Sequence, residues 1–370
     1  MNGDRMKKIM ILGYLTQSKT GNKSFGGAER NMVMLANSLA ERGYDICLCS
    51  VEGSHLPYQL NSDVELLTSE VSYKNKLKTH GDIFFNTIKS IRNVQPDLII
   101  SFWPHPTFYA LLFTKIKRIK MIYSERNDPS REYAGLAKLF HTVISYFCNG
   151  YVFQNQGAQS YFPQKSIKNS TVIHNPLSFT KKDVPNGTRV VRNFKRIISV
   201  GRLTEQKNHS MLIGAFSKYN ETHPDSILEI FGEGALYQDL KKQIKMLNME
   251  NNIILRGTTS QILEEIASSD MFVLTSKYEG MPNVLMEALA LGVPVVSTDF
   301  SPGTVRELIT HGVNGLICDI TESDLIDKMT MYDDESLVGQ VSRNSIKIFE
   351  THNIEEITDQ WERFLIETMS

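Results

Sequence analysis

The sequence predicts an α/β protein built from two doubly wound domains in tandem, and three observations support this fold class. Short apolar runs of strand type alternate with amphipathic helical runs through most of the 370 residues. The alternation pauses over residues 175–195, which are polar and carry Pro and Gly, and then starts again. The chain is also longer than one ordinary hydrophobic core accommodates. We therefore expect one domain over residues 1–176 and a second over residues 177–353.

The first domain opens with a βαβ unit. Residues 8–13 (KIMILG) form a buried strand, and residues 28–42 carry apolar side chains at the spacing of one helix face. Gly43 is placed to end that helix, and residues 45–51 form the next strand. Because a helical crossover joins parallel neighbours, the sheet is predicted to be parallel. Further strands are expected at residues 97–102, 120–124, 150–154 and 171–174.

The second domain repeats the same alternation. A helix at residues 354–369 then ends the chain and is expected to pack back on the first domain, with Trp361 as a packing residue. In doubly wound sheets, ligands bind beyond the carboxyl ends of the strands, so a cleft between the two domains is the expected site. Strands of the second domain are predicted at residues 197–201, 227–232, 253–256, 271–275 and 293–298.

Charge is divided unevenly along the chain. Lys and Arg total 40 against 41 Asp and Glu, a balance that disfavours a bulk nucleic-acid binder. Residues 1–176 hold 21 basic and 13 acidic side chains, whereas residues 177–370 hold 19 and 28. The first half is therefore expected to meet an anionic partner, with segregated solvated faces as the alternative. Its two basic clusters are Lys74, Lys76 and Lys78, and Lys115, Lys117, Arg118 and Lys120.

The four cysteines fit neither a disulfide framework nor a zinc site. No pair has C-x-x-C spacing, so Cys47, Cys49, Cys148 and Cys318 are expected to be reduced and buried. The N-terminal apolar run is too short for a secretory signal, and no apolar stretch of about 18 residues occurs. These features predict a cytoplasmic protein without a membrane-spanning helix.

Two glycine-containing loops follow predicted strands. Gly26 and Gly27 precede the first helix, where backbone N–H groups and the helix N-terminus favour an anion. Gly232 and Gly234, with Glu233 between them, form a second turn that permits close approach. A simple glycine turn is the alternative at Gly26 and Gly27, and the turn at residues 232–234 is a weak signal by itself.

The strongest chemical signal lies in the second domain. Arg202 and Lys207 share one loop after a strand, where both are able to reach a single diphosphate, with surface ion pairs as the alternative. Glu279 precedes a predicted helix and Glu287 lies on it, eight residues later. Pro282 suits the first helical position, and the free N–H groups of this helix start offer an anion site. Carboxylates on either side of that site are good partners for sugar hydroxyls. The backbone and side chains expected around it are Gly280, Met281, Pro282, Asn283 and Val284.

Together these motifs resemble those of family-4 retaining glycosyltransferases of the GT-B fold, over nearly the whole chain. The motifs that carry the resemblance are, in order, Gly26-Gly27-Ala28-Glu29-Arg30, Gly201-Arg202-Leu203 with Lys207-Asn208, Gly232-Glu233-Gly234, and Glu279 with Glu287 as E-x7-E. Within that family, the chain resembles above all the bacterial enzymes that extend undecaprenyl-diphosphate-linked glycans for capsule, O-antigen or protein glycosylation.

The resemblance implies roles for these residues on the donor side. Arg202 and Lys207 match the pair that grips the nucleotide diphosphate, Glu287 matches the acid on the ribose hydroxyls, and Glu279 matches the acid on the donor sugar. The turn at residues 232–234 and the backbone near Arg256 and Gly257 match the wall around the base. Gly26 and Gly27 match glycines close to the donor phosphates.

On the other side, His105 matches a cleft histidine near the donor, with a histidine bonded to loop backbone as the alternative. Glu125 and Arg126 resemble an acceptor-side motif in which Arg126 holds a phosphate or carboxylate, and a structural pair between the two is the alternative. No Asp-x-Asp follows a strand, so neither a metal nor another cofactor is expected. Charge on the departing diphosphate would be stabilised by the two cations and the helix N-terminus.

The resulting prediction is a retaining glycosyltransferase that moves a hexose or N-acetylhexosamine from a nucleotide sugar, UDP-linked, to a lipid-linked saccharide. It is expected at the inner face of the cell membrane, held peripherally by an anionic surface. Alternatives are a soluble acceptor, another two-domain enzyme such as a nucleotide-sugar epimerase or a phosphorylase, and a non-catalytic sugar-nucleotide binder.

Overall fold

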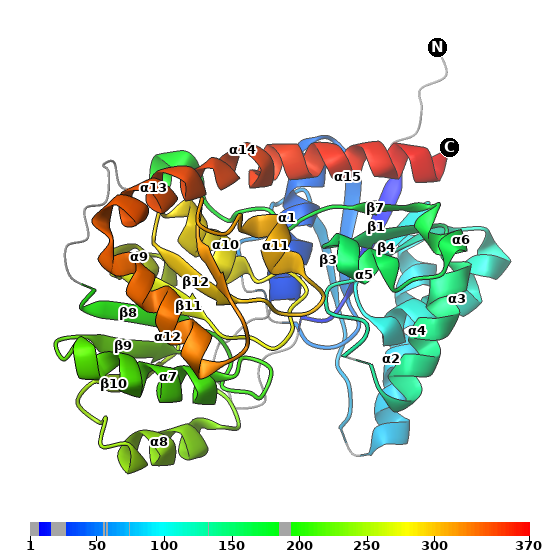
Figure 1. The fold of residues 1–370 in the computed structure, drawn as a ribbon. Helices are drawn as coiled ribbons and strands as arrows, with labels where there is room; N and C mark the ends of the chain where they lie inside the picture. Colours follow the sequence, from blue (N-terminus) through cyan, green and yellow to red (C-terminus); the bar gives the residue numbers. More distant parts are fainter. Residues whose placement is uncertain are drawn as a thin grey trace. The chain divides into compact units, whose positions relative to one another are not determined.

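The computed structural model describes residues 7–15, 27–54, 56, 58–73, 75–131, 133–184 and 194–370. The described chain divides into two compact units, one that runs up to Ser178 and includes Ile354–Ser370, and one over Phe179–Asn353. The boundary lies two residues from the predicted one. Figure 1 shows the elements of both units.

Seven parallel strands form one sheet in the described part of the first unit, in the order β3-β2-β1-β4-β5-β6-β7. Their near-continuous apolar composition suits a sheet covered on both faces. The short strand β3 was not predicted from the sequence. The strands are β1 (Lys8–Gly13), β2 (Asp45–Ser50), β3 (Glu65–Thr68), β4 (Leu98–Ser101), β5 (Lys120–Ser124), β6 (Gly150–Phe153) and β7 (Ser170–Val172).

Two sets of helices bury the two faces of this sheet (Figure 1). One face packs against α1 (Gly27–Glu41) and α15 (Ile354–Met369), and the other against α2 (Lys76–Val94), α3 (Pro104–Lys117) and α4 (Gly135–Phe147). The short helices α5 (Gln156–Ser160) and α6 (Gln164–Ile167) follow β6.

Helix α15 belongs to the first unit although it is formed by the end of the chain. Its Glu362 carboxylate accepts hydrogen bonds from Arg42 at 2.7 Å and from the Tyr44 hydroxyl at 2.9 Å. Trp361 is 3% exposed and belongs to the same core as the β1 and β4 side chains, which is the predicted packing role.

The second unit contains a six-stranded parallel sheet in the order β10-β9-β8-β11-β12-β13. The last strand was not predicted from the sequence. The strands are β8 (Arg196–Val200), β9 (Ile227–Phe231), β10 (Ile253–Gly257), β11 (Met271–Leu274), β12 (Val295–Thr298) and β13 (Leu316–Cys318). The helices are α7 (His209–Thr222), α8 (Tyr237–Met246), α9 (Ile262–Ser268), α10 (Asn283–Ala290), α11 (Thr304–Leu308), α12 (Glu322–Thr330), α13 (Glu335–Ser345) and α14 (Phe349–His352).

All four cysteines are free and buried, as predicted. Burial raises the pKa of the Cys49 and Cys318 thiols to about 12, so neither is a reactive thiolate at neutral pH. None of the helices in the described ranges combines the length and apolarity needed to cross a bilayer.

Candidate active site

The order of the second sheet brings two loops together at its carboxyl edge. The chain leaves β8 toward β9 on one side and later returns to β11 on the other, so the loops that follow β8 and β11 are neighbours. Such a reversal of strand order is where open α/β sheets bind ligands. The two loops are joined by Gln206, whose backbone oxygen accepts from Lys277 N at 2.8 Å and whose side-chain amide donates to Tyr278 O at 2.9 Å.

This junction places Lys207 against Glu279. The ammonium of Lys207 donates to Glu279 Oε1, and the Ser276 hydroxyl donates to the same oxygen at 2.7 Å. The two side chains are only 11% and 9% exposed, so the pair is largely withdrawn from water. Removing one partner from such a pair leaves an uncompensated charge in a poorly solvated site. The sequence singled out both residues but did not predict that they pair with each other.

Arg202 lies on the same loop and remains exposed. One guanidinium nitrogen donates to Gln206 Oε1 at 3.1 Å, and no carboxylate of the described residues forms an ion pair with it. Since Glu279 offsets the charge of Lys207, Arg202 supplies the uncompensated positive charge of this loop junction.

His209 is a supporting residue that the sequence reasoning missed. It is the first residue of α7 and is 3% exposed, and its Nε2 lies 3.3 Å from Gly201 O. Burial lowers the pKa of His209 to about 4, so the ring is neutral at pH 7 and donates to that carbonyl through Nε2. The sequence feature that could have identified His209 is its position two residues after Lys207, at the start of a helix.

The glycines at 232 and 234 serve a backbone contact. A Cβ on Gly232 would lie 2.0 Å from Gly201 O, and one on Gly234 would lie 2.3 Å from Leu203 O. The backbone of Glu233 accepts from Leu203 N at 2.8 Å. The turn therefore packs on the loop that carries Arg202 and fixes it, and its expected place beside the base stays a prediction.

The side chain of Arg256 is engaged in an ion pair within the sheet, whereas the prediction concerned the backbone near Arg256 and Gly257. Its Nε donates to Glu229 Oε1 at 2.6 Å, and Arg196 Nε donates to the other oxygen of that carboxylate at 2.6 Å. Burial opposes ionisation of Glu229, but the two guanidinium groups outweigh it and lower the pKa of that carboxyl. The Arg256 side chain is thus held within a four-residue ion cluster with Glu229, Arg196 and Glu265, from β8, β9, β10 and α9. Gly257 beside it has a positive φ of 72°.

Helix α10 begins at Asn283, one residue later than predicted. Pro282 has an extended backbone (φ −78°, ψ 105°) and is the N-cap rather than the first helical residue. The Gly280 carbonyl accepts from Thr304 Oγ1 at 2.6 Å, which fixes the turn before the helix. Glu287 on the second turn is 2% exposed, so it is a buried carboxylate and not a surface residue. Met281 is also buried, whereas Asn283 and Val284 are partly exposed.

In the first unit, Glu125 is buried (1% exposed) at the end of β5. Its carboxylate accepts from the backbone N–H groups of Arg126 at 2.9 Å and Asn127 at 3.1 Å, and from the Tyr133 hydroxyl at 2.7 Å. His141 Nε2 lies 3.0 Å from the other oxygen. These partners hold the carboxylate in place and fix the loop after β5, and the expected acceptor-side role of Glu125 stays a prediction.

Arg126 does not form the alternative side-chain pair with Glu125. Its guanidinium donates to Asn175 Oδ1 at 3.1 Å and lies over the rings of Phe102 (4.5 Å) and Trp361 (5.8 Å). Burial lowers the pKa of Arg126 to about 9, although the neighbouring Glu125 charge opposes this shift. The Arg126 guanidinium is thus contacted by two aromatic rings and an amide. It is therefore able to bind an anionic group.

His105 is the second residue of α3, at the end of the helix next to the carboxyl edge of the sheet. Its ring lies 5.0 Å from that of His80 and 5.4 Å from that of Phe140. Burial, and secondarily the charge of His80, lower the pKa of His105. His80 had not been singled out from the sequence. Gly26 lies outside the described residues, and Gly27 is the exposed first residue of α1.

Two family descriptions match the chain. Residues 25–180 match Glycosyltransferase Family 4, and residues 181–340 match Glycosyl transferases group 1. An uncharacterized glycosyltransferase of Haemophilus influenzae is 28% identical, over 92% of this chain and 97% of its own length. The Campylobacter jejuni enzyme named GalNAc-α-(1→4)-GalNAc-α-(1→3)-diNAcBac-PP-undecaprenol α-1,4-N-acetyl-D-galactosaminyltransferase is 24% identical, over 92% of this chain and 95% of its length. The crystal structure of Anabaena HepE in complex with UDP superposes with a TM-score of 0.78 at 20% identity, over 97% of this chain and 100% of that one.

Proposed function

Because the chain belongs to the family-4, group 1 glycosyltransferases of the GT-B fold, we propose that it transfers a sugar from a UDP-sugar to a hydroxyl of a lipid-linked saccharide. The observation that carries this proposal is the junction of the loops after β8 and β11. It gathers Arg202, Lys207 and Glu279 at a strand-order reversal, beside the N-terminus of α10. The named substrates of the Campylobacter enzyme and the UDP in the HepE crystals support the choice of acceptor and donor.

In the proposed donor site, different residues of the second unit bind different parts of the nucleotide. Arg202 and Lys207 hold the diphosphate, and Glu287 accepts hydrogen bonds from the ribose hydroxyls. The turn at residues 232–234 and the backbone beside Arg256 bound the base. Arg202 stabilises the charge that develops on the leaving diphosphate, and that charge is larger in the transition state than in the bound donor.

Glu279 is proposed to contact the donor sugar while it remains paired with Lys207. The pair then acts as one unit, in which the carboxylate orients the sugar and the ammonium faces the phosphate. We propose that the reaction retains the anomeric configuration, with the donor phosphate helping to deprotonate the attacking hydroxyl. His105, neutral at pH 7, supplies a hydrogen bond near the reacting groups, and Arg126 holds an anionic part of the acceptor.

The two cations and the helix N-terminus supply the charge stabilisation in this proposal, so a metal is not required. The membrane would hold the acceptor, and the basic first domain would associate peripherally with an anionic surface. We propose that the enzyme acts at the inner face of the cell membrane.

The decisive experiment measures release of UDP from a panel of UDP-sugars with and without an undecaprenyl-diphosphate-linked saccharide in detergent. The proposal predicts release that depends on the acceptor, survives EDTA, and falls on the order of tenfold to a hundredfold in Arg202→Ala. Release that requires no acceptor, or interconversion of the donor sugar, would show a hydrolase or an epimerase instead. Transfer to a free saccharide at equal efficiency would remove the lipid-linked acceptor from the proposal.

A further inference from the structure

The outer surface of α2, α3 and α4 exposes large apolar side chains in helical stripes. Leu112 and Ile116 are one turn apart on α3 and are 53% and 77% exposed, and Phe85 on α2 is 69% exposed. Side chains three or four residues apart share a helix face, so Leu112 and Ile116 on α3 form one exposed apolar stripe, and Leu136 and Leu139 on α4 form another. The exposed large apolar residues of the three helices are Leu77, Phe85, Leu112, Ile116, Leu136, Leu139, Tyr146 and Phe147.

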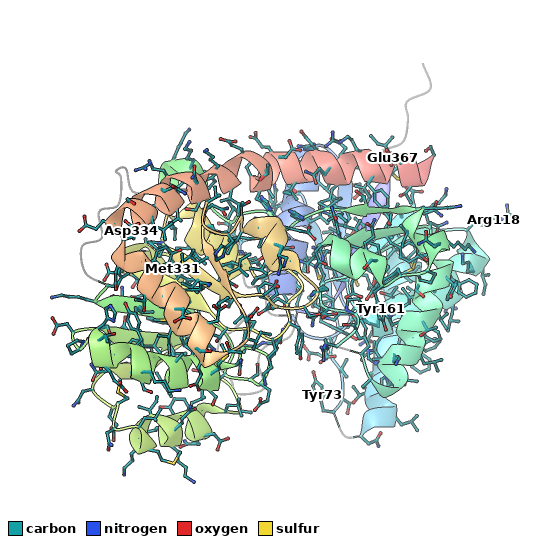
Figure 2. The ribbon with its side chains drawn as sticks, in the orientation of Figure 1. Tyr73, Arg118, Tyr161, Met331, Asp334 and Glu367 are labelled. Atoms are coloured by element: carbon teal, nitrogen blue, oxygen red, sulfur yellow. The ribbon has the colours of Figure 1, made fainter. Side chains whose placement is uncertain are left out.

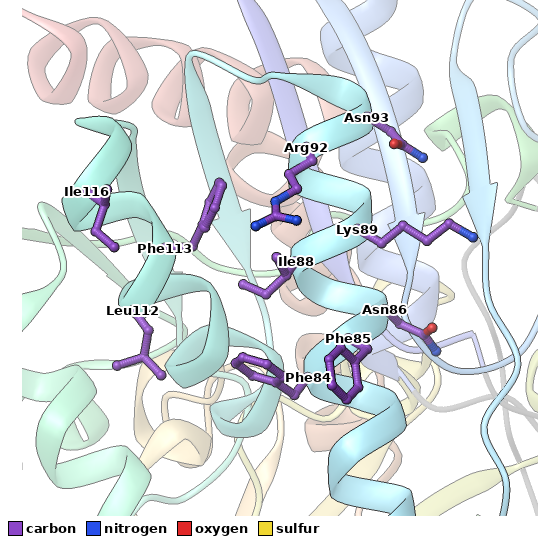
Figure 3. Close-up of a pocket in the computed structure, with 10 residues that line it drawn as sticks. All are labelled: Phe84, Phe85, Asn86, Ile88, Lys89, Arg92, Asn93, Leu112, Phe113 and Ile116. Atoms are coloured by element: carbon purple, nitrogen blue, oxygen red, sulfur yellow. The ribbon is translucent and has the colours of Figure 1, made fainter.

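A groove of about 570 Å³ runs between α2 and α3 within this surface (Figure 3). Phe84, Phe85 and Ile88 line it from α2, and Leu112, Phe113 and Ile116 line it from α3. The groove lies toward the later residues of both helices, away from the helix end that carries His105. It is therefore separate from the proposed reaction site.

The same surface carries an excess of positive charge. Among the described side chains of α2, α3 and α4, one is acidic, Asp82, and six are basic: Lys78, Lys89, Arg92, Lys115, Lys117 and Lys138. Arg92 points toward the groove from α2 in Figure 3, whereas the Lys89 side chain, which also belongs to the lining, extends away from α3. Arg118 projects outward just beyond α3 in Figure 2. None of the groove's cations forms an ion pair with another described residue, and Arg92 lies over the Phe113 ring at 5.5 Å.

We propose that α2, α3 and α4 form a bilayer-inserting face, and that the groove between α2 and α3 receives an acyl chain of an anionic lipid. Apolar side chains with flanking cations are the composition of surfaces that lie in the headgroup region. The apolar residues extend beyond the groove to all three helices, which favours a bilayer over one isolated lipid chain. The inference deepens the proposed function, because it assigns the membrane contact to apolar insertion as well as to charge.

Insertion and simple charge attraction differ in their response to salt. Electrostatic attraction decays within a Debye length, about 3 Å at 1 M salt, whereas apolar burial persists. The protein is therefore expected to bind vesicles of phosphatidylglycerol and phosphatidylcholine at low salt and to keep a bound fraction at 1 M NaCl. The triple variant Lys89→Gln, Lys115→Gln, Lys117→Gln should weaken only the salt-sensitive part.

The contribution of apolar insertion is tested with Phe85→Ser combined with Ile116→Ser. Both positions are exposed, so these substitutions should have little effect on folding. Partition onto anionic vesicles is expected to fall on the order of a hundredfold, about tenfold for each side chain. The matched control is Met246→Ser with Ile366→Ser, which removes apolar side chains that are 67% and 56% exposed elsewhere. An equal loss in the control pair, or none in the test pair, would overturn the inference.

A second measurement reports insertion directly. Since the four native cysteines are buried, an environment-sensitive fluorophore can be attached to Ile116→Cys, with Met246→Cys as the control. The inference predicts a blue shift on anionic vesicles for the first label alone. If instead the protein is a dimer without lipid and the serine variant is a monomer, the face is a contact between copies and the inference is wrong.

These outcomes are separable from the proposed activity. The serine variant should keep UDP release with a detergent-solubilised acceptor. Vesicle binding without any sugar transfer would support the membrane face and contradict the proposed function. Sugar transfer without vesicle binding would support the proposed function and contradict the membrane face.

Discussion

Lys207 in the second unit and Arg126 in the first lie at the carboxyl edges of parallel sheets, but their partners differ. Lys207 is paired with the Glu279 carboxylate, whereas Arg126 is held by the Asn175 amide and two aromatic rings. The first cation is ion-paired with a carboxylate before any ligand arrives, whereas the guanidinium of the second forms no side-chain ion pair among the described residues, although the Glu125 charge lies nearby. This difference indicates that Lys207 and Glu279 form their ion pair before a ligand binds, and we call them the preset pair. Arg126, in contrast, would form its ion pair with a bound anion.

The largest effect is expected from breaking the preset pair. Glu279→Gln leaves Lys207 without its carboxylate in a site where both side chains are about nine-tenths buried. We expect a loss of about 3–5 kcal/mol in the free energy of unfolding, measured by urea denaturation, and loss of sugar transfer. Replacing the pair together, with Lys207→Met and Glu279→Leu, should restore most of the stability and none of the activity.

An exposed pair provides the control for that experiment. Lys277 and Glu205 are 3.1 Å apart, 44% and 80% exposed, and join the same two loops. Glu205→Gln should cost less than about 1 kcal/mol. Equal costs at Glu205 and Glu279 would mean that burial does not distinguish the two pairs.

A pH titration tests the support behind the Arg202 loop. The pKa of His209 is about 4 in the folded chain, against 6.5 for an unperturbed histidine, so the unfolded chain binds the extra proton first. Stability is therefore retained above pH 6.5 and lost as the pH falls toward 4, by up to about 3 kcal/mol. In His209→Gln this part of the pH dependence should disappear, whereas the exposed His311→Gln should keep it.

Glu287 tests whether the second unit holds the nucleotide. Removing a charged hydrogen-bond acceptor costs about 1.5–3 kcal/mol, so Glu287→Gln should weaken UDP binding on the order of tenfold to a hundredfold in calorimetry. The exposed Glu264→Gln serves as the control. Unchanged UDP affinity in Glu287→Gln would remove this residue from the site.

The smallest effect on stability is expected at Arg126. Arg126→Gln removes a cation whose burial is already unfavourable, so the free energy of unfolding should change by less than about 1 kcal/mol. The KM for an anionic lipid-linked acceptor should nevertheless rise about tenfold, with KM for the donor unchanged. A large loss of stability with an unchanged acceptor KM would assign Arg126 a structural role only.

Apolar patterning predicted the central strands of both sheets well. Residues 8–13 and 120–124 were predicted with the bounds that β1 and β5 have in the structure. The two strands that were missed, β3 and β13, are four and three residues long and lie at sheet edges. Apolar runs of two or three residues are too short to be told from loop or helix segments by their spacing, so neither strand could be recognised from its own sequence.

The chemistry of the site was predictable residue by residue, but its pairings were not. Lys207 and Glu279 are 72 positions apart, and only the strand order of the folded sheet makes them neighbours. The burial of Glu125 likewise depends on Tyr133 and His141, whose side chains carry no sequence signal for that contact. Local motifs identify candidate groups, whereas sheet topology decides which of them meet.

The position of α15 has a consequence for the order in which the protein is made. Ile357, Trp361, Phe364 and Leu365 complete the core of the first unit, yet the ribosome adds them only after the whole of the second unit. Until then, the apolar face beside α1 has no cover. The N-terminal unit is therefore the first to be synthesised and the last to finish folding, and the nascent chain exposes an apolar surface until α15 is made.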